Sequence, residues 1–197
     1  MKKIALLLSL SIAFTSFGQL TKKTWLVGGS GSFYSYNETY NSPTYNTTAK
    51  YTSIDIFASV GYFIVDKLSA GLRPTFSSYK GKVTSSGGGS TNSYRLALGP
   101  FVRYYFLKID KQFNLLADVS YQMGVLQQLG ALHEKGKFNN FSLMGGTEVF
   151  FNGTAGMEIL LGYSQKIMSI ENSPGAFNSN KKGFQAAIGV TLHLEKL

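Results

Sequence analysis

The chain has no cysteine and only two histidines in its 197 residues. The lack of cysteine excludes a disulfide bond, a zinc–thiolate site, a thiol nucleophile and a lipidated cysteine. His133 and His193 leave little material for metal binding or for acid–base catalysis by imidazole. No serine and acid stand at a spacing that would complete a catalytic set with His133. We therefore expect no metal, no cofactor and no enzymatic activity.

Long apolar runs are also missing, except at the N-terminus. There the apolar run IALLLSLSIAF follows the basic residues MKK and precedes the small residues of TSFG. This is the layout of a secretory signal peptide. A membrane anchor is the alternative, but the run is too short to cross about 30 Å of hydrocarbon as a helix. We expect residues 1–18 to be cleaved and residues 19–197 to be exported as one domain without a spanning helix.

Charged residues are scarce, at 15% of the chain against the usual quarter or so. The formal net charge of +9 falls to +7 when Lys2 and Lys3 leave with the signal peptide. Most of the excess is lysine in polar segments. Because an exported chain does not meet nucleic acid, we expect no nucleic-acid partner. Outer-membrane lipids, including lipopolysaccharide, are the more natural partners for these cations.

What the chain does have is apolar alternation with a period of two. In the C-terminal segment GFQAAIGVTLHL, every second residue from Phe184 to Leu194 is apolar, and the residues between are small or polar. This pattern predicts a half-buried strand. Five other segments alternate in the same way, and residues 24–36 and 141–151 do so less decisively, so we expect eight strands in total. With the last segment, they are residues 24–36, 53–64, 69–79, 94–106, 113–125, 141–151, 156–164 and 183–194.

The connections between these strands alternate in length. Four long polar connections are expected at residues 37–50, 81–92, 127–137 and 169–181, and short ones near 65–67, 109–110 and 152–154. An even strand number with alternating loops predicts an all-β fold: an eight-stranded antiparallel up-and-down transmembrane β-barrel with short periplasmic turns and long extracellular loops. A soluble barrel of the lipocalin type is the competing fold.

Three features favour the membrane barrel over the lipocalin type. The less apolar face is rich in glycine and serine, which suits a tight interior better than an aqueous surface. Its charges are few and of both signs. Aromatic residues collect near the strand ends, where membrane interfaces would lie. The predicted lipid-facing and girdle aromatics are Trp25, Tyr62, Tyr104, Phe106, Phe151 and Tyr163.

Three segments, TWLVGGSGSF, VGYFIVDKLSAGL and GPFVRYYF, occur in this order. They resemble the outer membrane protein β-barrel domain family of small Gram-negative envelope proteins, over most of the mature chain. The resemblance implies an eight-stranded barrel in the cell outer membrane with both termini in the periplasm, and no common activity. It also implies the barrel-assembly machinery as a partner during insertion. One departure is the C-terminus VTLHLEKL, where Leu194 stands in place of the aromatic residue that this machinery usually reads.

The inner face is predicted to carry three arginines and four carboxylates. An interior of this size is filled by side chains, and buried charges must pair. If residues 152–154 form a three-residue turn, Glu148 and Glu158 face each other, and we expect Arg103 or Arg95 to reach between them. Arg103 is also expected close to Asp118. The predicted lumen charge network is Asp55, Arg73, Arg95, Arg103, Asp118, Glu148 and Glu158.

Two prolines interrupt otherwise regular strands. Pro74 and Pro100 are predicted to point outward and to lie almost opposite each other in one hairpin. Since proline cannot donate to a ladder, we expect a shared irregularity there, such as a bulge.

Three functions remain open from the sequence. The first is a structural barrel or a very narrow gated channel, in which ion pairs exchange partners. The second is a surface-exposed binding or adhesion barrel that contacts an unknown partner through its four long loops. An outer-membrane enzyme is the third and the least favoured.

Overall fold

A computed structural model describes residues 20–41, 46–83, 90–129, 134–170 and 177–195. The predicted signal peptide and His133 lie outside these ranges. Within them the chain forms strands and turns, and no helix there is long and apolar enough to cross a membrane. The strand segments are β1 (Trp25–Asn41), β2 (Asn46–Val65), β3 (Leu68–Leu72), β4 (Thr75–Val83), β5 (Ser90–Leu98), β6 (Pro100–Tyr105), β7 (Phe113–Leu129), β8 (Glu134–Phe150), β9 (Ala155–Ile170) and β10 (Phe177–Leu194).

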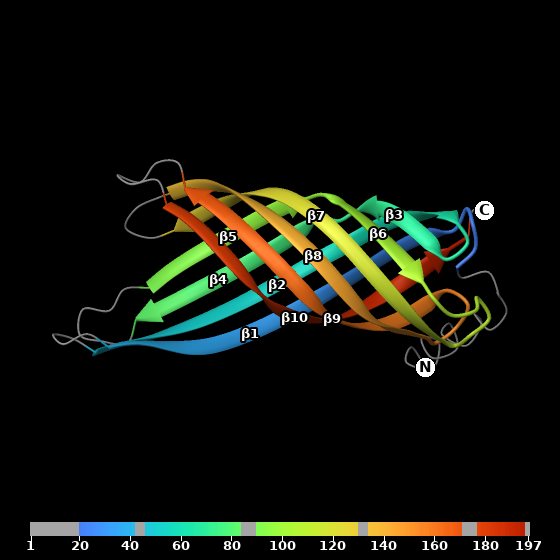
Figure 1. The fold of residues 1–197 in the computed structure, drawn as a ribbon, viewed down its shortest axis with the longest axis horizontal. Coiled ribbons are helices and arrows are strands. Elements are labelled where there is room, and N and C mark those ends of the chain that lie inside the picture. The colour runs from blue at the N-terminus through green and yellow to red at the C-terminus, as the bar shows by residue number, and fades with distance from the viewer. Residues whose placement is uncertain (1–19, 42–45, 84–89, 130–133, 171–176, 196–197) are drawn as a thin grey trace, which may run out of the picture.

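The segments form one antiparallel sheet that closes on itself (Figure 1). β1 pairs with β2 on one side and with β10 on the other, so the first and last strands meet. β3 and β4 both pair with β2, and β5 and β6 both pair with β7, so each couple is one strand in two parts. The ten segments therefore make eight strands, which confirms the predicted eight-stranded barrel.

The two broken strands are the ones that contain the prolines. β3 ends before Arg73 and Pro74, and β5 and β6 are separated by Gly99. The register is the same on both sides of the breaks, with Leu72 opposite Pro100 and Thr75 opposite Ala97. The expected irregularity is present as a break in each of the two strands, and it is not a bulge, because no extra residue is inserted. The two prolines are exposed, as predicted, but they lie diagonally, since Pro100 faces Leu72.

The hairpins at one end are longer than the sequence indicated. β1 and β2 remain paired out to Asn41 opposite Asn46, inside the connection expected at 37–50. The other three long connections are also shortened by strand residues. At the opposite end, the short connections are residues 66–67, 106–112 and 151–154. We call the two ends the long-hairpin end and the short-turn end.

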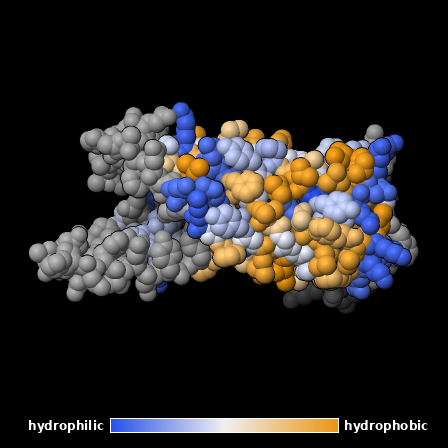
Figure 2. Space-filling view, in the orientation of Figure 1, coloured by the Kyte–Doolittle hydropathy of each residue, from blue (hydrophilic) through white to orange (hydrophobic). Residues whose placement is uncertain are grey.

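Side chains alternate between an exposed outer face and a buried inner face. Along β6, Pro100, Val102 and Tyr104 are exposed, whereas Phe101, Arg103 and Tyr105 are buried. Exposed Ile, Leu, Val and Phe side chains recur on every strand, and Figure 2 shows them gathered in a belt, with hydrophilic residues at the short-turn end. An exposed apolar band of this extent suits a hydrocarbon environment and would be unfavourable in water.

The interior is filled by side chains. One apolar cluster occupies the half near the short-turn end and includes Leu26, Phe63, Phe101, Phe150 and Leu160. Leu20, which precedes β1, is fully buried in the same cluster, and its carbonyl accepts a hydrogen bond of 2.8 Å from the backbone N–H of Lys67. Leu20 therefore packs into the short-turn end of the barrel.

Candidate functional site: the charged interior

Two arginines meet one aspartate in the middle of the barrel. β6 and β7 pair so that Arg103 lies directly opposite Asp118, and Arg103 Nε donates to Asp118 Oδ2 at 3.0 Å. Arg73, at the break after β3, donates to both oxygens of Asp118, at 2.6 and 2.7 Å. A bidentate guanidinium–carboxylate pair is among the strongest side-chain contacts. Asp118 is fully buried, so these contacts replace its hydration.

The two predicted facing glutamates lie opposite each other across β8 and β9. Glu158 accepts a hydrogen bond from Arg103 Nη1 at 2.7 Å and another from the hydroxyl of Ser30. Arg103 thus spans the barrel from Asp118 to Glu158. Of the two candidate arginines, Arg103 contacts one of the facing glutamates, Glu158, and the predicted bridge from Glu158 to Glu148 is not formed among the described residues.

Glu148 has different partners, and no arginine contacts it among the hydrogen bonds and ion pairs of the described residues. It accepts hydrogen bonds from the hydroxyl of Tyr105 at 2.6 Å and from Thr191, and its Oε1 lies 2.8 Å from His193 Nε2. The ring of His193 packs against Phe63 and Phe150. Glu148 is fully buried, so it depends on these neutral donors and on His193.

We define the deep charge cluster by these connected side chains: Arg73, Arg103, Tyr105, Asp118, Glu148, Glu158 and His193. Its two arginines face three carboxylates, and His193 supplies a third positive charge when it is protonated. Every member is 3% exposed or less. A set of charges this well buried is stable only when its members stay together.

Two inner glycines make room for these carboxylates. A Cβ on Gly156 would overlap the carboxylate of Glu148, and one on Gly189 would overlap the hydroxyl of Ser30, which donates to Glu158. Because the barrel is narrow, a bulky carboxylate on one strand requires a residue without a side chain on the next. The small residues of the inner face are therefore part of the site.

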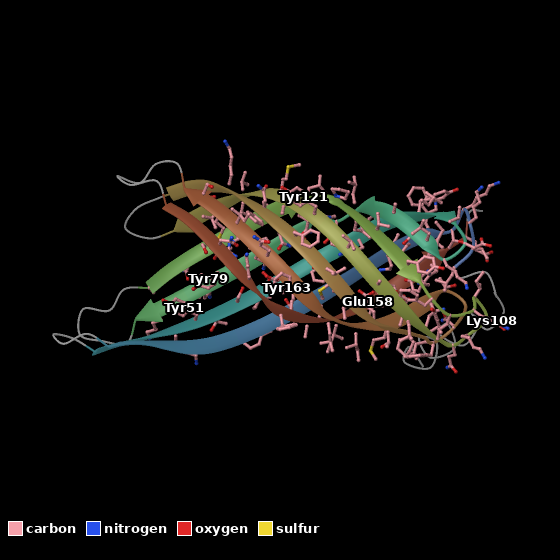
Figure 3. All side chains as sticks on the ribbon, in the orientation of Figure 1. Tyr51, Tyr79, Lys108, Tyr121, Glu158 and Tyr163 are labelled. Carbon is pink, nitrogen blue, oxygen red and sulfur yellow. The ribbon has the colours of Figure 1, made fainter. Side chains whose placement is uncertain are left out.

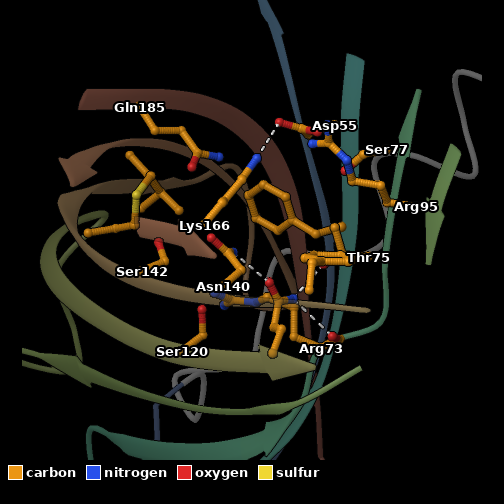
Figure 4. Close-up of a pocket in the computed structure, with 15 residues that line it drawn as sticks. Asp55, Arg73, Thr75, Ser77, Arg95, Ser120, Asn140, Ser142, Lys166 and Gln185 are labelled. Atoms are coloured by element: carbon orange, nitrogen blue, oxygen red, sulfur yellow. Dashed lines mark hydrogen bonds and ion pairs between the residues drawn. The ribbon is translucent and has the colours of Figure 1, made fainter. Parts of the chain in front are cut away.

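Arg95 lies apart from this cluster, in the half toward the long hairpins. It is 5% exposed, and its guanidinium carbon lies 5.7 Å from the centre of the Tyr79 ring. Asp55 is in the same half, where its Oδ2 lies 3.2 Å from Lys166 Nζ. Figure 4 shows Asp55, Arg95 and Lys166 around one recess in the interior. The predicted network is thus divided into two groups.

An aromatic and amide layer separates the two groups. The guanidinium of Arg73 lies 4.6 Å from the ring centre of Phe101 and 5.4 Å from that of Phe57. Gln122 donates to the backbone carbonyl of Arg73 at 3.1 Å and accepts from Asn140 at 2.9 Å. These contacts link side chains and backbone across the barrel between its two halves.

The predicted girdle aromatics all lie on the outer side of the strands. Trp25 and Tyr62 contact each other edge to face, with 5.1 Å between ring centres, and Tyr104 and Phe106 do the same at 5.2 Å. Figure 3 shows Tyr163 midway along the barrel. Five of the six side chains are exposed, and the sixth, that of Tyr62, is partly buried.

Sequence reasoning missed three groups in the interior. Tyr105 has inward parity, but the predicted network contains only charged residues and so omits it. Lys166 also has inward parity, two residues past the end of the strand predicted at 156–164. The alternation places Gln122 on the inner face without indicating a role. No group of three or more residues suited to metal binding occurs among the residues that the structure describes.

Known proteins resemble this chain in structure and not in sequence. No family model matches the chain, and no curated protein matches it in sequence. Among solved structures, it is similar to the outer membrane protein OprG from Pseudomonas aeruginosa, with a TM-score of 0.57 and 12% identity over 89% of this chain and 98% of that one. The chain has the fold of a small outer-membrane β-barrel.

A second solved structure gives the same result. Neisserial surface protein A (NspA) has a TM-score of 0.51 and 11% identity, over 87% of this chain and 97% of that one. At identities this low the likeness shows the fold alone, and it points to an outer-membrane location. The fold predicted from the alternating pattern is thereby confirmed.

Proposed function

We propose that the protein is an integral outer-membrane β-barrel whose interior is closed to solutes at rest, with a structural role in the cell envelope. The observation that carries this proposal is the deep charge cluster. Arg103 bridges Asp118 and Glu158 at 3.0 and 2.7 Å, and both carboxylates are at most 1% exposed. Side chains that meet across the whole interior leave no water-filled pore of porin width.

A very narrow gated path is the second candidate, because a second carboxylate lies close to the partners that Arg103 has now. Arg103 Nη1 lies 3.4 Å from the hydroxyl of Tyr105, which itself donates to Glu148. A shift of Arg103 from Glu158 toward Glu148 would exchange one buried pair for another. Such an exchange would open a path for small ions only.

The proposed surroundings of the barrel follow from its outer face. Its partners would be outer-membrane lipids, including lipopolysaccharide, and the barrel-assembly machinery during insertion. The exposed apolar belt supports the lipid contact. We also propose that the protein is not an enzyme, since the acid–base groups of the cluster are too deeply buried to reach a substrate.

Planar-bilayer recording of the refolded mature protein tests this function. The closed barrel predicts no steady conductance from the unaltered protein. Arg103→Ala should produce discrete openings if the cluster closes the barrel, and Arg95→Ala, outside the cluster, should not. A large steady conductance of the unaltered protein would contradict the proposal. Openings that both variants leave unchanged would contradict the gated path.

A further inference from the structure

The barrel wall is incomplete between its first and last strands. β1 pairs with β10 only from Trp25 opposite Leu194 to Gly31 opposite Ile188. Beyond Gly31, β1 continues to Asn41 beside β2, and β10 before Ile188 continues beside β9. Figure 1 shows the two strands diverging toward the long-hairpin end. Within the described residues, the ladder that closes the barrel therefore covers only the half near the short turns.

A cavity of about 490 Å³ lies in this divergence, and we call it the side pocket. Its outer part is formed by apolar residues that face away from the barrel axis, among them Phe33 and Phe184, which are 67% and 95% exposed. Its inner part is formed by Asp55, Arg95 and Lys166. These three residues also line the recess in Figure 4, so the side pocket leads into the interior.

The charges of the side pocket are unbalanced. Arg95, Lys166 and Lys182 face a single carboxylate, Asp55, which already lies 3.2 Å from Lys166 Nζ. Arg95 Nε and Asp55 Oδ1 are buried, and neither has a hydrogen-bond partner among the described residues. Buried guanidinium groups ordinarily have an anionic or polar partner. Apart from the ring of Tyr79, the Arg95 guanidinium thus has no ionic partner among the described residues, and it lies, 5% exposed, at the inner end of an apolar opening.

We propose that the side pocket binds an amphiphile with an anionic headgroup and a single acyl chain. The headgroup would lie against Arg95 and Lys166, with Lys182 at the mouth. The chain would leave between β1 and β10, over Phe33 and Phe184. A free anion would leave this apolar wall uncovered, and a neutral amphiphile would leave Arg95 without an ionic partner. The volume is within the range of sites for small molecules, about 300–1,000 Å³. The deep charge cluster closes the far side, so this is a binding site and not a passage.

Photo-crosslinking tests this proposal on the full mature chain in nanodiscs of zwitterionic lipid. The probes are a long-chain fatty acid that carries a diazirine on its chain and the methyl ester of the same acid. The acid should label peptides of β1 and β10, and the ester should label them about tenfold less. Arg95→Gln and Lys166→Gln should each reduce labelling by the acid about tenfold, as expected for loss of a charged hydrogen-bond donor.

Matched variants separate the parts of the proposal. Lys108→Gln removes one positive charge at the short-turn end (Figure 3) and should leave labelling unchanged. Phe184→Ala should reduce labelling by the long-chain acid, and it should leave labelling by a short-chain acid unchanged. The mobility shift on heating in detergent electrophoresis shows which variants are folded.

Four outcomes would overturn the proposal. The first is equal labelling by acid and ester, and the second is no labelling of β1 and β10. The third is labelling that Arg95→Gln and Lys166→Gln leave unchanged in folded protein. The fourth is competition by sodium acetate at the concentration at which unlabelled long-chain acid competes. The last would indicate a site for a free anion. Competition by a single-chain lysophospholipid with a phosphate monoester headgroup would extend the proposal from carboxylates to phosphates.

Discussion

The two halves of the interior differ in how their buried arginines are paired. In the deep charge cluster, Arg103 contacts two carboxylates and the chain closes completely around them. In the side pocket, Arg95 is nearly as buried but has no ionic partner within the described ranges, and the pocket that it lines lies where β1 and β10 diverge. Burial alone therefore does not distinguish the two arginines. The difference is that one is held by this chain's own acids and the other is available to a ligand.

The largest expected effect comes from removing the central arginine. Arg103→Ala leaves Asp118 with one arginine and Glu158 with only Ser30, so the free energy of unfolding should fall by about 3–5 kcal/mol. Urea titration of the refolded barrel in detergent, followed by tryptophan fluorescence of Trp25, measures this. Arg95→Ala is the matched control and should cost less than half as much. Equal losses would mean that the two halves are energetically alike.

A smaller effect is expected from the glycine that accommodates Glu148. Gly156→Ala places a methyl group against the Glu148 carboxylate, and the resulting overpacking should cost about 1–3 kcal/mol in the same titration. Gly183→Ala is the control, because no atom lies within 4 Å of the added Cβ in the described structure. If both variants behave like the unaltered protein, the deep charge cluster is looser than its distances indicate.

The pair in the side pocket should matter less for stability and more for binding. Asp55→Asn replaces the buried carboxylate beside Lys166, whose side chain is 16% exposed, by a neutral amide that still accepts a hydrogen bond, so the loss of stability should be about 1–2 kcal/mol. The same change makes the side pocket more positive. Labelling by the fatty-acid probe should therefore rise, whereas Asp66→Asn at the short-turn end should not change it. A fall in labelling would show that Asp55 itself contacts the ligand.

The sequence indicates which residues lie on the inner and outer faces of the strands. It says less about the height of each residue along the barrel axis. Alternation predicts which side of a strand a residue occupies, and a tight turn fixes the local register, so the sequence alone pairs Glu148 with Glu158. Which charges meet across the barrel depends on strand tilt and stagger, which no local pattern encodes. Arg103 and Arg95 have the same parity and are therefore equivalent candidates, by sequence, for the same glutamates.

The outer half is harder to predict for a related physical reason. Around Lys166, the segment SQKIMSI mixes polar and apolar residues on both faces, so its inward parity gives no sign of burial. The early end of the β1–β10 ladder has no local signal either, because it concerns two strands at opposite ends of the chain. The burial of Lys166 and the early end of the β1–β10 ladder both depend on pairing between strands that are far apart in the sequence.

The smallest effect is expected at the strand breaks that separate the two halves. Pro74 is exposed and the register continues unchanged past it, so Pro74→Ala should alter stability by less than about 0.5 kcal/mol. Its carbonyl already accepts a hydrogen bond of 3.0 Å from the backbone N–H of Ala58, which the substitution keeps. Gly99→Ala is the contrasting change, because a Cβ there would overlap the carbonyl of Tyr121. If Pro74→Ala were the more harmful of the two, the proline would hold Arg73 in position against Asp118, and the break would be part of the deep charge cluster.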